Sequence, residues 1–419
     1  MRPFQSDAAE PCDAATGDSP LPILFVTVLI DLIGFGIIIP ILPFMAPQVG
    51  ADNMDIALLI ASYSIFGAIV GPFWGKLSDR IGRKPVLLIC LSGAAVSYVI
   101  LAFAHTLTML YVSRIIAGIM SGNFGVASAM VADITEPKDR AKYMGIMGSA
   151  FGLGMVIGPF LGGILSGDDG DFMLPGLVAA GLSAAALLAG LLFLKESHDR
   201  EARAFQKAEM LAGALNGNMF QTLKRSGNSK LVFQYFLNNT CHTCFSYLFP
   251  LWVGVSLAWG AREVGMTFGA IGVTMAILQA GVIGLLVRKM GELRLLAVGA
   301  SLMCAGFILA IAADSETVIL LAFFISVTGG TIGTPVLNAL LTNRSAPSLR
   351  GQMMGMGSSS SAFGRMFGPL GAGILLSQFG YTAAWSLGIV ASLMILVWAI
   401  SQLRLPAENV EDAGASSHL

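Results

Sequence analysis

Four ionisable side chains lie inside long apolar stretches of the sequence: Asp31, Arg114, His242 and Arg365. A charge at the centre of a membrane-spanning helix costs about 2.5–3.5 kcal/mol on insertion scales, so such residues usually mark functional sites. Because a buried carboxyl favours its neutral form, Asp31 could load and release a proton near neutral pH. Alternatively, it is a hydrogen-bond partner that pins a helix. His242 is a candidate for a second proton site.

The two arginines keep their protons, so each must face a polar cavity or pair with an anion. Arg114 could tune the protonation of Asp31 by approaching and leaving it, or it could be a fixed structural or substrate-anchoring charge. Arg365 could bind an anionic substrate group or hydrogen-bond to backbone carbonyls.

The run Asn238–Thr243, NNTCHT, is too polar to face lipid, so we expect one side of it to line a cavity. The spacing Cys241-His-Thr-Cys244 offers two thiols and one imidazole, an incomplete set of metal ligands. We therefore predict neither a metal site nor redox chemistry here. The five cysteines imply no disulfide framework.

The elements that must position these residues are membrane-spanning helices. Of 419 residues, 55% are hydrophobic and only 12% are charged, and the mean hydropathy is +0.76, whereas soluble domains carry about 25% charged residues. The net charge of −1 argues against nucleic acid as a partner. A bilayer core needs about 20 apolar residues, and twelve such runs can be marked: 22–44, 56–77, 86–104, 108–131, 143–166, 173–194, 231–255, 264–287, 294–313, 317–341, 352–377 and 382–402.

The spans divide into six and six around a polar segment. We predict an all-α integral membrane protein with tails at 1–21 and 403–419, six-helix bundles at 22–194 and 231–402, and a central loop at 195–230. Residues 200–223 of that loop could form a surface helix. Residues 1–20 lack the features of a secretory signal peptide. Of the 24 basic residues, 21 fall in the tails and one alternate set of loops, which predicts that both termini and the central loop are cytoplasmic.

The two halves of the chain look like copies. Six positions recur 210 residues later: Arg140, Gly145, Gly154, Gly158, Pro159 and Gly163 match Arg350, Gly355, Gly364, Gly368, Pro369 and Gly373. At an offset of 209, Gly75 and Gly82 match Gly284 and Gly291, while Asp79 matches Arg288 and Arg83 matches Glu292, which inverts the charges. Such parallel repeats give two bundles related by an axis along the membrane normal, which transporters rock around a central site.

A charged stretch, GKLSDRIGRKP at 75–85, separates the second and third apolar runs. It resembles the signature loop of the major facilitator superfamily. Three further stretches resemble motifs of its twelve-span drug:proton antiporters, and in particular of the tetracycline efflux antiporters: DLIGFGIIIPILP at 31–43, RIIAG at 114–118 followed by Asp133 and Arg140, and GMVIGPFLGG at 154–163. The likeness is strong over the first six spans and moderate over the last six.

The resemblance implies the major facilitator fold and a proton-coupled transporter that exports amphiphilic small molecules by alternating access. It places the spans 22–44, 108–131, 231–255 and 317–341 around a central cavity. With the residues above, the candidates for that cavity are Asp31, Tyr63, Asn123, Asn238, Asn239, His242, Phe245, Gln279, Asn338 and Arg365. Aromatic residues such as Phe245 are equally ordinary lipid-facing residues.

The signature loop implies a cytoplasmic gate, in which Asp79 faces the start of the span 352–377 while Arg83 and Arg140 pair with Asp133. The gate residues are Gly75, Asp79, Arg80, Gly82, Arg83, Asp133 and Arg140. Lys76, Arg80 and Lys84 are alternatively only topology anchors. The antiporter motif comprises Gly154, Gly158, Pro159, Gly162 and Gly163, where the Gly-x-x-x-Gly spacing allows close helix packing and Pro159 permits a bend.

One departure concerns the substrate. The tetracycline exporters carry a histidine before a glutamine in their eighth span; here the glutamine is Gln279 and the equivalent position is Met275, which puts tetracycline in doubt. A lipid or glycolipid flippase and a metabolite:proton symporter are alternatives of the same fold. A membrane receptor is a weaker alternative, because it would not need Asp31 and Arg114 inside the bilayer.

Energy is expected to come from the proton gradient. The stretch 71–77, GPFWGKL, lacks the four-residue spacer and the Ser or Thr of a phosphate-binding loop, so we expect no use of ATP. We also expect no cofactor and no enzyme activity. The family suggests a monomer, multi-pass in a bacterial inner (plasma) membrane.

Overall fold

The computed structural model describes residues 20–135, 139–167, 172–197, 228–345 and 350–404, and their regular structure is helical. The helices are α1 (Pro20–Gln48), α2 (Asn53–Ile81), α3 (Arg83–Ala102), α4 (Leu107–Ile119), α5 (Asn123–Ile134), α6 (Arg140–Ser166), α7 (Met173–Phe193), α10 (Ser229–Leu257), α11 (Ala261–Ile277), the π-helix η1 (Leu278–Val282), α12 (Ile283–Met290), α13 (Glu292–Ile311), α14 (Glu316–Asn343) and α15 (Arg350–Leu403). The surface helix expected within 200–223 lies outside the described residues.

These helices correspond to the twelve predicted spans. Nine stretches of the described residues are long and apolar enough to cross a membrane. One of them, within α15, holds two spans that meet at Gly380, where a φ of 79° interrupts the helix. The other two predicted spans are α10, which carries the polar run at 238–243, and the succession α11–η1–α12, which is broken around Gly281.

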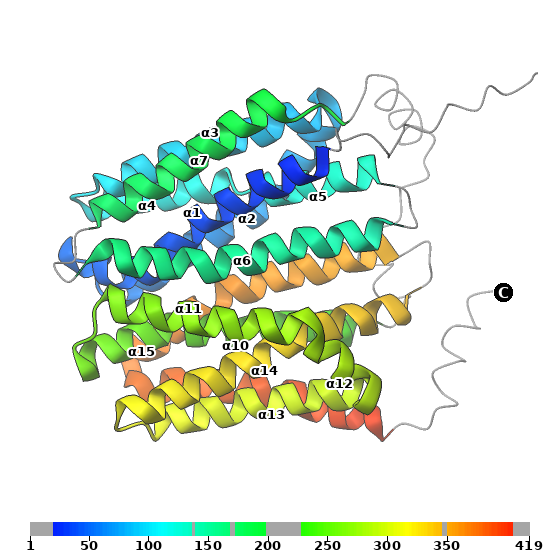
Figure 1. Ribbon diagram of the computed structural model, residues 1–419. Coiled ribbons are helices and arrows are strands. Elements are labelled where there is room, and N and C mark those ends of the chain that lie inside the picture. The colour runs from blue at the N-terminus through cyan, green and yellow to red at the C-terminus, as the bar shows by residue number, and fades with distance from the viewer. Residues whose placement is uncertain (1–19, 136–138, 168–171, 198–227, 346–349, 405–419) are drawn as a thin grey trace, which may run out of the picture.

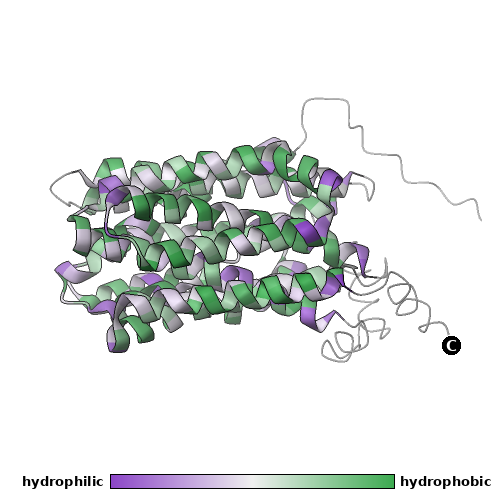
Figure 2. Ribbon diagram, turned by 90° about the horizontal axis from the view of Figure 1, so that it is seen from below, coloured by the Kyte–Doolittle hydropathy of each residue, from purple (hydrophilic) through white to green (hydrophobic). Residues whose placement is uncertain are grey.

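The helices form two bundles that lie side by side (Figure 1), α1 to α7 in one and α10 to α15 in the other. The main contacts between the bundles pair α6 with α11 and α2 with α15. The start of α1 and the end of α15 lie at the same end of the molecule, on the right of Figure 1. Hydrophobic residues cover most of each helix and hydrophilic ones gather mainly toward the helix ends (Figure 2), as a lipid environment requires.

The bundles touch closely at the end opposite to these chain ends. A Cβ atom on Gly163 of α6 would lie 2.8 Å from the Cα of Gly265 in α11, so the two backbones are in direct contact. Nearby, the hydroxyl of Tyr247 donates to the carbonyl of Asn53 at 2.6 Å. Toward the other end, several glycines on the helices that form the contacting pairs have no atom within 4 Å of their Cβ position: Gly71, Gly75, Gly145, Gly148 and Gly355.

The span predicted at 108–131 is broken between α4 and α5 by a side chain from another helix. The indole of Trp74 donates to the carbonyl of Ile119 at 2.5 Å. A Cβ atom on Gly122 would lie 2.6 Å from the same ring. An inserted side chain is a common cause of such breaks, and glycine leaves the room for it here.

Aromatic rings form the centre of the second bundle. Phe245 is fully buried, and its ring centroid lies 5.4 Å from that of Phe323 and 4.7 Å from that of Trp385. Phe249 stacks on Phe323 at 4.1 Å. The prediction that Phe245 lines the substrate cavity is therefore wrong, because its ring lies in this packed core and has no free surface.

Candidate functional site

Asp31 is held between three helices of the first bundle. Its side chain is 4% exposed. Ser183 of α7 donates a hydrogen bond to one carboxyl oxygen at 3.1 Å, and the side-chain amide of Asn123 in α5 donates to the other. In the described part of the chain, no ion pair within 4.0 Å involves Asp31. Asp31 is thus stabilised by neutral donors and not by a cation.

Arg114, on α4, is a second buried charge of the first bundle. It is 3% exposed. Its Nη2 donates to Ser113 at 3.3 Å, while its Nε is buried without a hydrogen-bond partner in the protein. Leaving a buried donor unsatisfied is unfavourable, so this guanidinium has spare capacity to bind an anion or a polar group.

Two tyrosines connect the charged groups. Tyr63 stacks on Phe35, with ring centroids 4.9 Å apart, and interacts electrostatically with Asp31, Arg114 and Arg365. Tyr98 is 4% exposed and interacts with Asp31, Arg114 and Tyr63. Sequence reasoning missed Tyr98 and Ser183; the available signal was a polar side chain in the middle of an apolar span.

The second bundle contributes Arg365 and His242 to the same region. Arg365 of α15 has an exposed side chain, yet it interacts electrostatically with Tyr63 of the other bundle and with His242 of α10. The exposed side chain of Arg365 thus lies within electrostatic range of groups in both bundles. Through Tyr63 and Arg365, electrostatic interactions connect Asp31, Arg114 and His242, while their lining of a common cavity stays a prediction.

The other predicted cavity residues divide into two kinds. Asn238 is buried and donates to the carbonyl of Gly330 and to Thr334, so it ties α10 to α14. Half-buried Asn239 donates to Ser361 at 3.0 Å, and half-buried Asn338 accepts from Tyr235 at 2.8 Å. Gln279 is exposed on η1, and Met275 is half-buried one turn earlier. Asn239, Asn338 and Gln279 thus keep some accessible surface, whereas Asn238 has almost none.

Arg83 is the centre of the predicted gate. It is 5% exposed and pairs with Asp79 at 2.7 Å and with Asp133 at 2.9 Å. Gly82, just before it, has a φ of 112°, which favours glycine. Gly75 and Arg80 are exposed. The side chain of Arg140 lies outside the described residues, so its pairing with Asp133 stays a prediction, as does the placement of Asp79 against the start of α15.

Glu196 completes this gate and was not predicted. Its carboxylate accepts hydrogen bonds from the backbone amides of Arg83, at 2.8 Å, and Lys84, at 3.1 Å. These amides belong to the first turn of α3, where an anion is favoured by free N–H groups and by the helix dipole. The first residues of the central segment are thereby fixed to the signature loop.

The antiporter motif on α6 packs against both neighbours. A Cβ atom on Gly158 would lie 2.6 Å from the Cα of Gly36 in α1, and Gly154 and Gly162 lie equally close to α1. Gly163 faces Gly265 of the second bundle, and Pro159 lies beside Gly36. The motif therefore joins the helix that carries Asp31 to the opposite bundle.

Comparisons with known proteins agree with this arrangement. Residues 24–278 and 231–417 match the family model of the Major Facilitator Superfamily. A tetracycline resistance protein, class H, of Pasteurella multocida is 32% identical over 386 residues, 90% of this chain and 94% of that protein. Multidrug resistance protein 2 of Bacillus subtilis (strain 168) is 27% identical over 90% of this chain and 94% of its own length. Among solved structures, the human organic anion transporter MFSD10 aligns with a TM-score of 0.67 and 24% identity, covering 91% of this chain and 98% of that one.

Proposed function

The chain belongs to the major facilitator superfamily, and on that basis we propose that it is a proton-coupled antiporter that exports amphiphilic small molecules. One observation carries the proposal: Asp31 is buried among neutral hydrogen-bond donors in the first bundle, and it interacts with Tyr63, which also interacts with Arg114 and with Arg365 of the second bundle. A carboxyl in that setting can exist with or without its proton, which a coupling group must do.

Antiport requires that proton and substrate compete. In the proton-free state, the carboxylate of Asp31 adds a negative charge to the region that holds two arginines. In the protonated state, that charge is gone and the arginines favour an anionic or polar group. The two states therefore differ in their affinity for a substrate, and a ligand can shift a conformational equilibrium only through such a difference. Arg114, with its unpartnered Nε, is the group best able to respond.

The substrate class is proposed from the relatives and from the lining residues. The relatives are tetracycline and multidrug resistance proteins. Here Met275 lies at the position where a histidine was expected for tetracycline, and Tyr63 and Phe35 supply a stacked aromatic surface. Such surfaces suit flexible amphiphilic molecules. Tetracycline belongs in the test panel, but we do not propose it as the sole substrate.

Proton release from proteoliposomes tests the proposal. Vesicles with an acidic interior and an internal pH dye would receive a panel of amphiphilic drugs, tetracycline included, outside. We expect some drugs to discharge the gradient in the wild type and none in Asp31→Asn, because the amide keeps the shape but cannot carry the proton. Asp314→Asn is the matched control, since Asp314 is an exposed aspartate in a connection of the second bundle.

Each outcome is informative. If Asp31→Asn responds like the wild type, Asp31 is not the proton carrier. If no compound moves protons in the wild type, the export proposal fails, and lipids and metabolites become the next panel.

The same proposal covers the protein's oligomeric state, its membrane and its energy source. We propose that the protein works as a monomer in an inner (plasma) membrane with both termini in the cytoplasm. Its energy would come from the proton gradient, without ATP, a cofactor or an enzymatic reaction. The side on which the bundles touch, at Gly163 and Gly265, would then be the outer side.

A further inference from the structure

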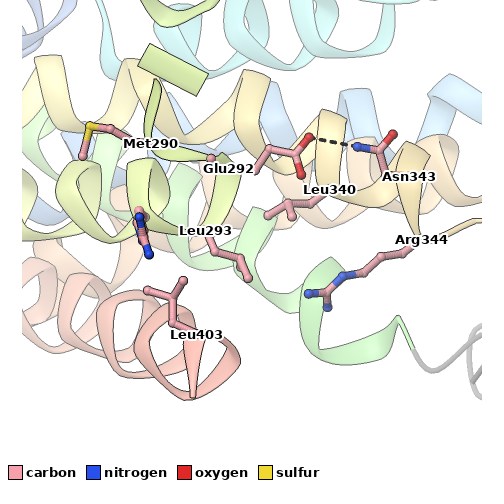
Figure 3. A pocket seen from close by; sticks show the side chains of 9 residues that line it. Met290, Glu292, Leu293, Leu340, Asn343, Arg344 and Leu403 are labelled. Atoms are coloured by element: carbon pink, nitrogen blue, oxygen red, sulfur yellow. Dashed lines mark hydrogen bonds between the residues drawn. The ribbon is translucent and has the colours of Figure 1, made fainter. Parts of the chain in front are cut away.

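The internal repeat places two different structures at corresponding positions of the two bundles. In the first bundle, Arg83 pairs with Asp133 at the cytoplasmic end proposed above. The offsets of 209 and 210 residues carry these positions to Glu292 and Asn343. There the side-chain amide of Asn343 donates to the carboxylate of Glu292 at 2.9 Å (Figure 3). The contact between the two helices is kept, but its buried cation is gone.

A cavity of about 420 Å³ lies beside the Glu292–Asn343 contact (Figure 3). Its apolar lining comes from Met290, Leu293, Leu340 and Leu403, and its basic lining from Arg294 and Arg344. Leu403 is 42% exposed. Arg344 also lines a second cavity of about 250 Å³, together with Lys230 and Trp398. The two cavities therefore share one guanidinium.

Arg344 is a cation without a matching anion. It follows the last residue of α14, just beyond the span, and is half-buried. Its Nη1 donates to the amide oxygen of Gln402 at 3.1 Å, and its guanidinium lies 6.0 Å from the ring centroid of Trp398. In the described part of the chain, no carboxylate lies within 4.0 Å of it. Burial lowers the pKa of the Arg344 guanidinium, an effect that the carboxylate of Glu292 partly offsets.

Charge and shape together indicate the ligand. Three basic side chains, Lys230, Arg294 and Arg344, line the two cavities against one acidic side chain, Glu292. A phosphate would supply the missing negative charge, because guanidinium groups bind phosphate oxygens well. Leu293 and Leu403 keep accessible surface and lie at the ends of the apolar helices α13 and α15, next to these basic side chains, so an acyl chain can extend over them. Basic pockets between helices on this side of a membrane are suited to anionic head groups.

We propose that these cavities bind the head group of an anionic phospholipid, with its phosphate at Arg344 and an acyl chain over Leu293 and Leu403. The lipid would join α13, α14 and the end of α15. In the first bundle the chain supplies both charges of the corresponding contact. In the second bundle it supplies the cations and the membrane supplies the anion.

Native mass spectrometry of the full chain in detergent tests this site. The protein would be titrated with phosphatidylglycerol and with phosphatidylcholine of the same acyl chains. We expect tighter binding of phosphatidylglycerol, and a loss of about fivefold in its affinity in Arg344→Gln, the effect of about one basic residue near an anionic head group. Lys230→Gln should weaken binding in the same direction and provides a second variant if Arg344→Gln does not fold.

Arg288→Gln is the matched control, because Arg288 is exposed at the end of α12 and lines neither cavity. Equal affinities for the two lipids would overturn the proposal, and so would equal weakening by Arg344→Gln and Arg288→Gln. A third arm measures the thermal stability of the protein with inorganic phosphate alone. If phosphate stabilises the protein as much as phosphatidylglycerol does, the site binds a free anion and the lipid assignment is wrong.

Discussion

Replacing Gly265 by alanine should open the end of the molecule at which the two bundles touch. The added Cβ atom would lie 2.5 Å from the Cα of Gly163 and 2.6 Å from the carbonyl oxygen of Pro159. Both are backbone atoms, so no side chain can move aside to make room. Ordinary contact begins at 3.4 Å, and the two helices would therefore have to separate by 0.9 Å, from 2.5 to 3.4 Å.

The size of the effect follows from the cost of overpacking. Extra atoms in a packed interface cost about 1–3 kcal/mol. This cost applies only to the conformation in which α6 and α11 touch, and it disappears when the bundles part. The population of the touching state relative to the parted one should fall by roughly 5-fold to 150-fold. A wild-type ratio of about ten to one would become about two to one or less.

Distances between spin labels at His105 and Asp314 would measure this ratio. The two positions are exposed, lie in the connections before α4 and α14, and belong to different bundles at the end where the bundles touch. The labels would be attached to His105→Cys and Asp314→Cys in a Cys12→Ser background. The cysteines of the described residues are buried, which favours selective labelling.

Gly284→Ala is the matched control, because a Cβ atom there would meet no atom within 4 Å. Both changes replace a helical glycine by alanine and bring the same gain of about 1 kcal/mol in helix propensity. We expect longer distances in Gly265→Ala only. If both variants keep the wild-type distribution, or both change it alike, the backbone contact between Gly163 and Gly265 does not control this end.

Two further predictions concern the signature loop. Glu196→Gln should raise the hydrogen-exchange rate of the Arg83 and Lys84 amides by about tenfold, because a charged acceptor at the start of α3 is replaced by a neutral one. Unchanged exchange rates would show that the two hydrogen bonds add nothing to the stability of that turn. Arg83→Gln should lower the thermal stability of the purified protein more than Asp133→Asn does. The arginine variant removes both ion pairs of Arg83, whereas the aspartate variant keeps the pair with Asp79. A larger loss of stability in Asp133→Asn would contradict this account of the pairings.

Much of the fold could be predicted from the sequence. The family and the helical two-bundle architecture are confirmed. Spans could be found because a bilayer imposes a minimum apolar length, and Asp31, Arg114, His242 and Arg365 could be grouped because charges in apolar spans need a common polar space. The break between α4 and α5 could not be predicted, since it depends on the side chain of Trp74 from a distant part of the chain.

Other misses have the same origin. Phe245 was assigned to the cavity because an aromatic residue has the same pattern whether it faces a ligand, lipid or a packed core, and the neighbours that decide this come from α13, α14 and α15. Glu196 was missed because a glutamate at the start of a polar segment gives no sign of its partners. Ser183 and Tyr98 are ordinary residues in membrane helices and gain meaning only beside Asp31.

The closed end has a further consequence for how the protein responds to its surroundings. Backbone atoms dominate the contact between Gly163 and Gly265, and they carry no titratable group. Changes of salt or pH therefore do not act on this backbone contact itself. A proton bound at Asp31 must therefore affect the contact between Gly163 and Gly265 from a distance. The close packing of α1 on α6 at Gly36 and Gly158 can transmit this effect. The two helices would then move as one rigid body. Asp31 on α1 would bind the proton, and Gly163 on α6 forms the contact with the second bundle.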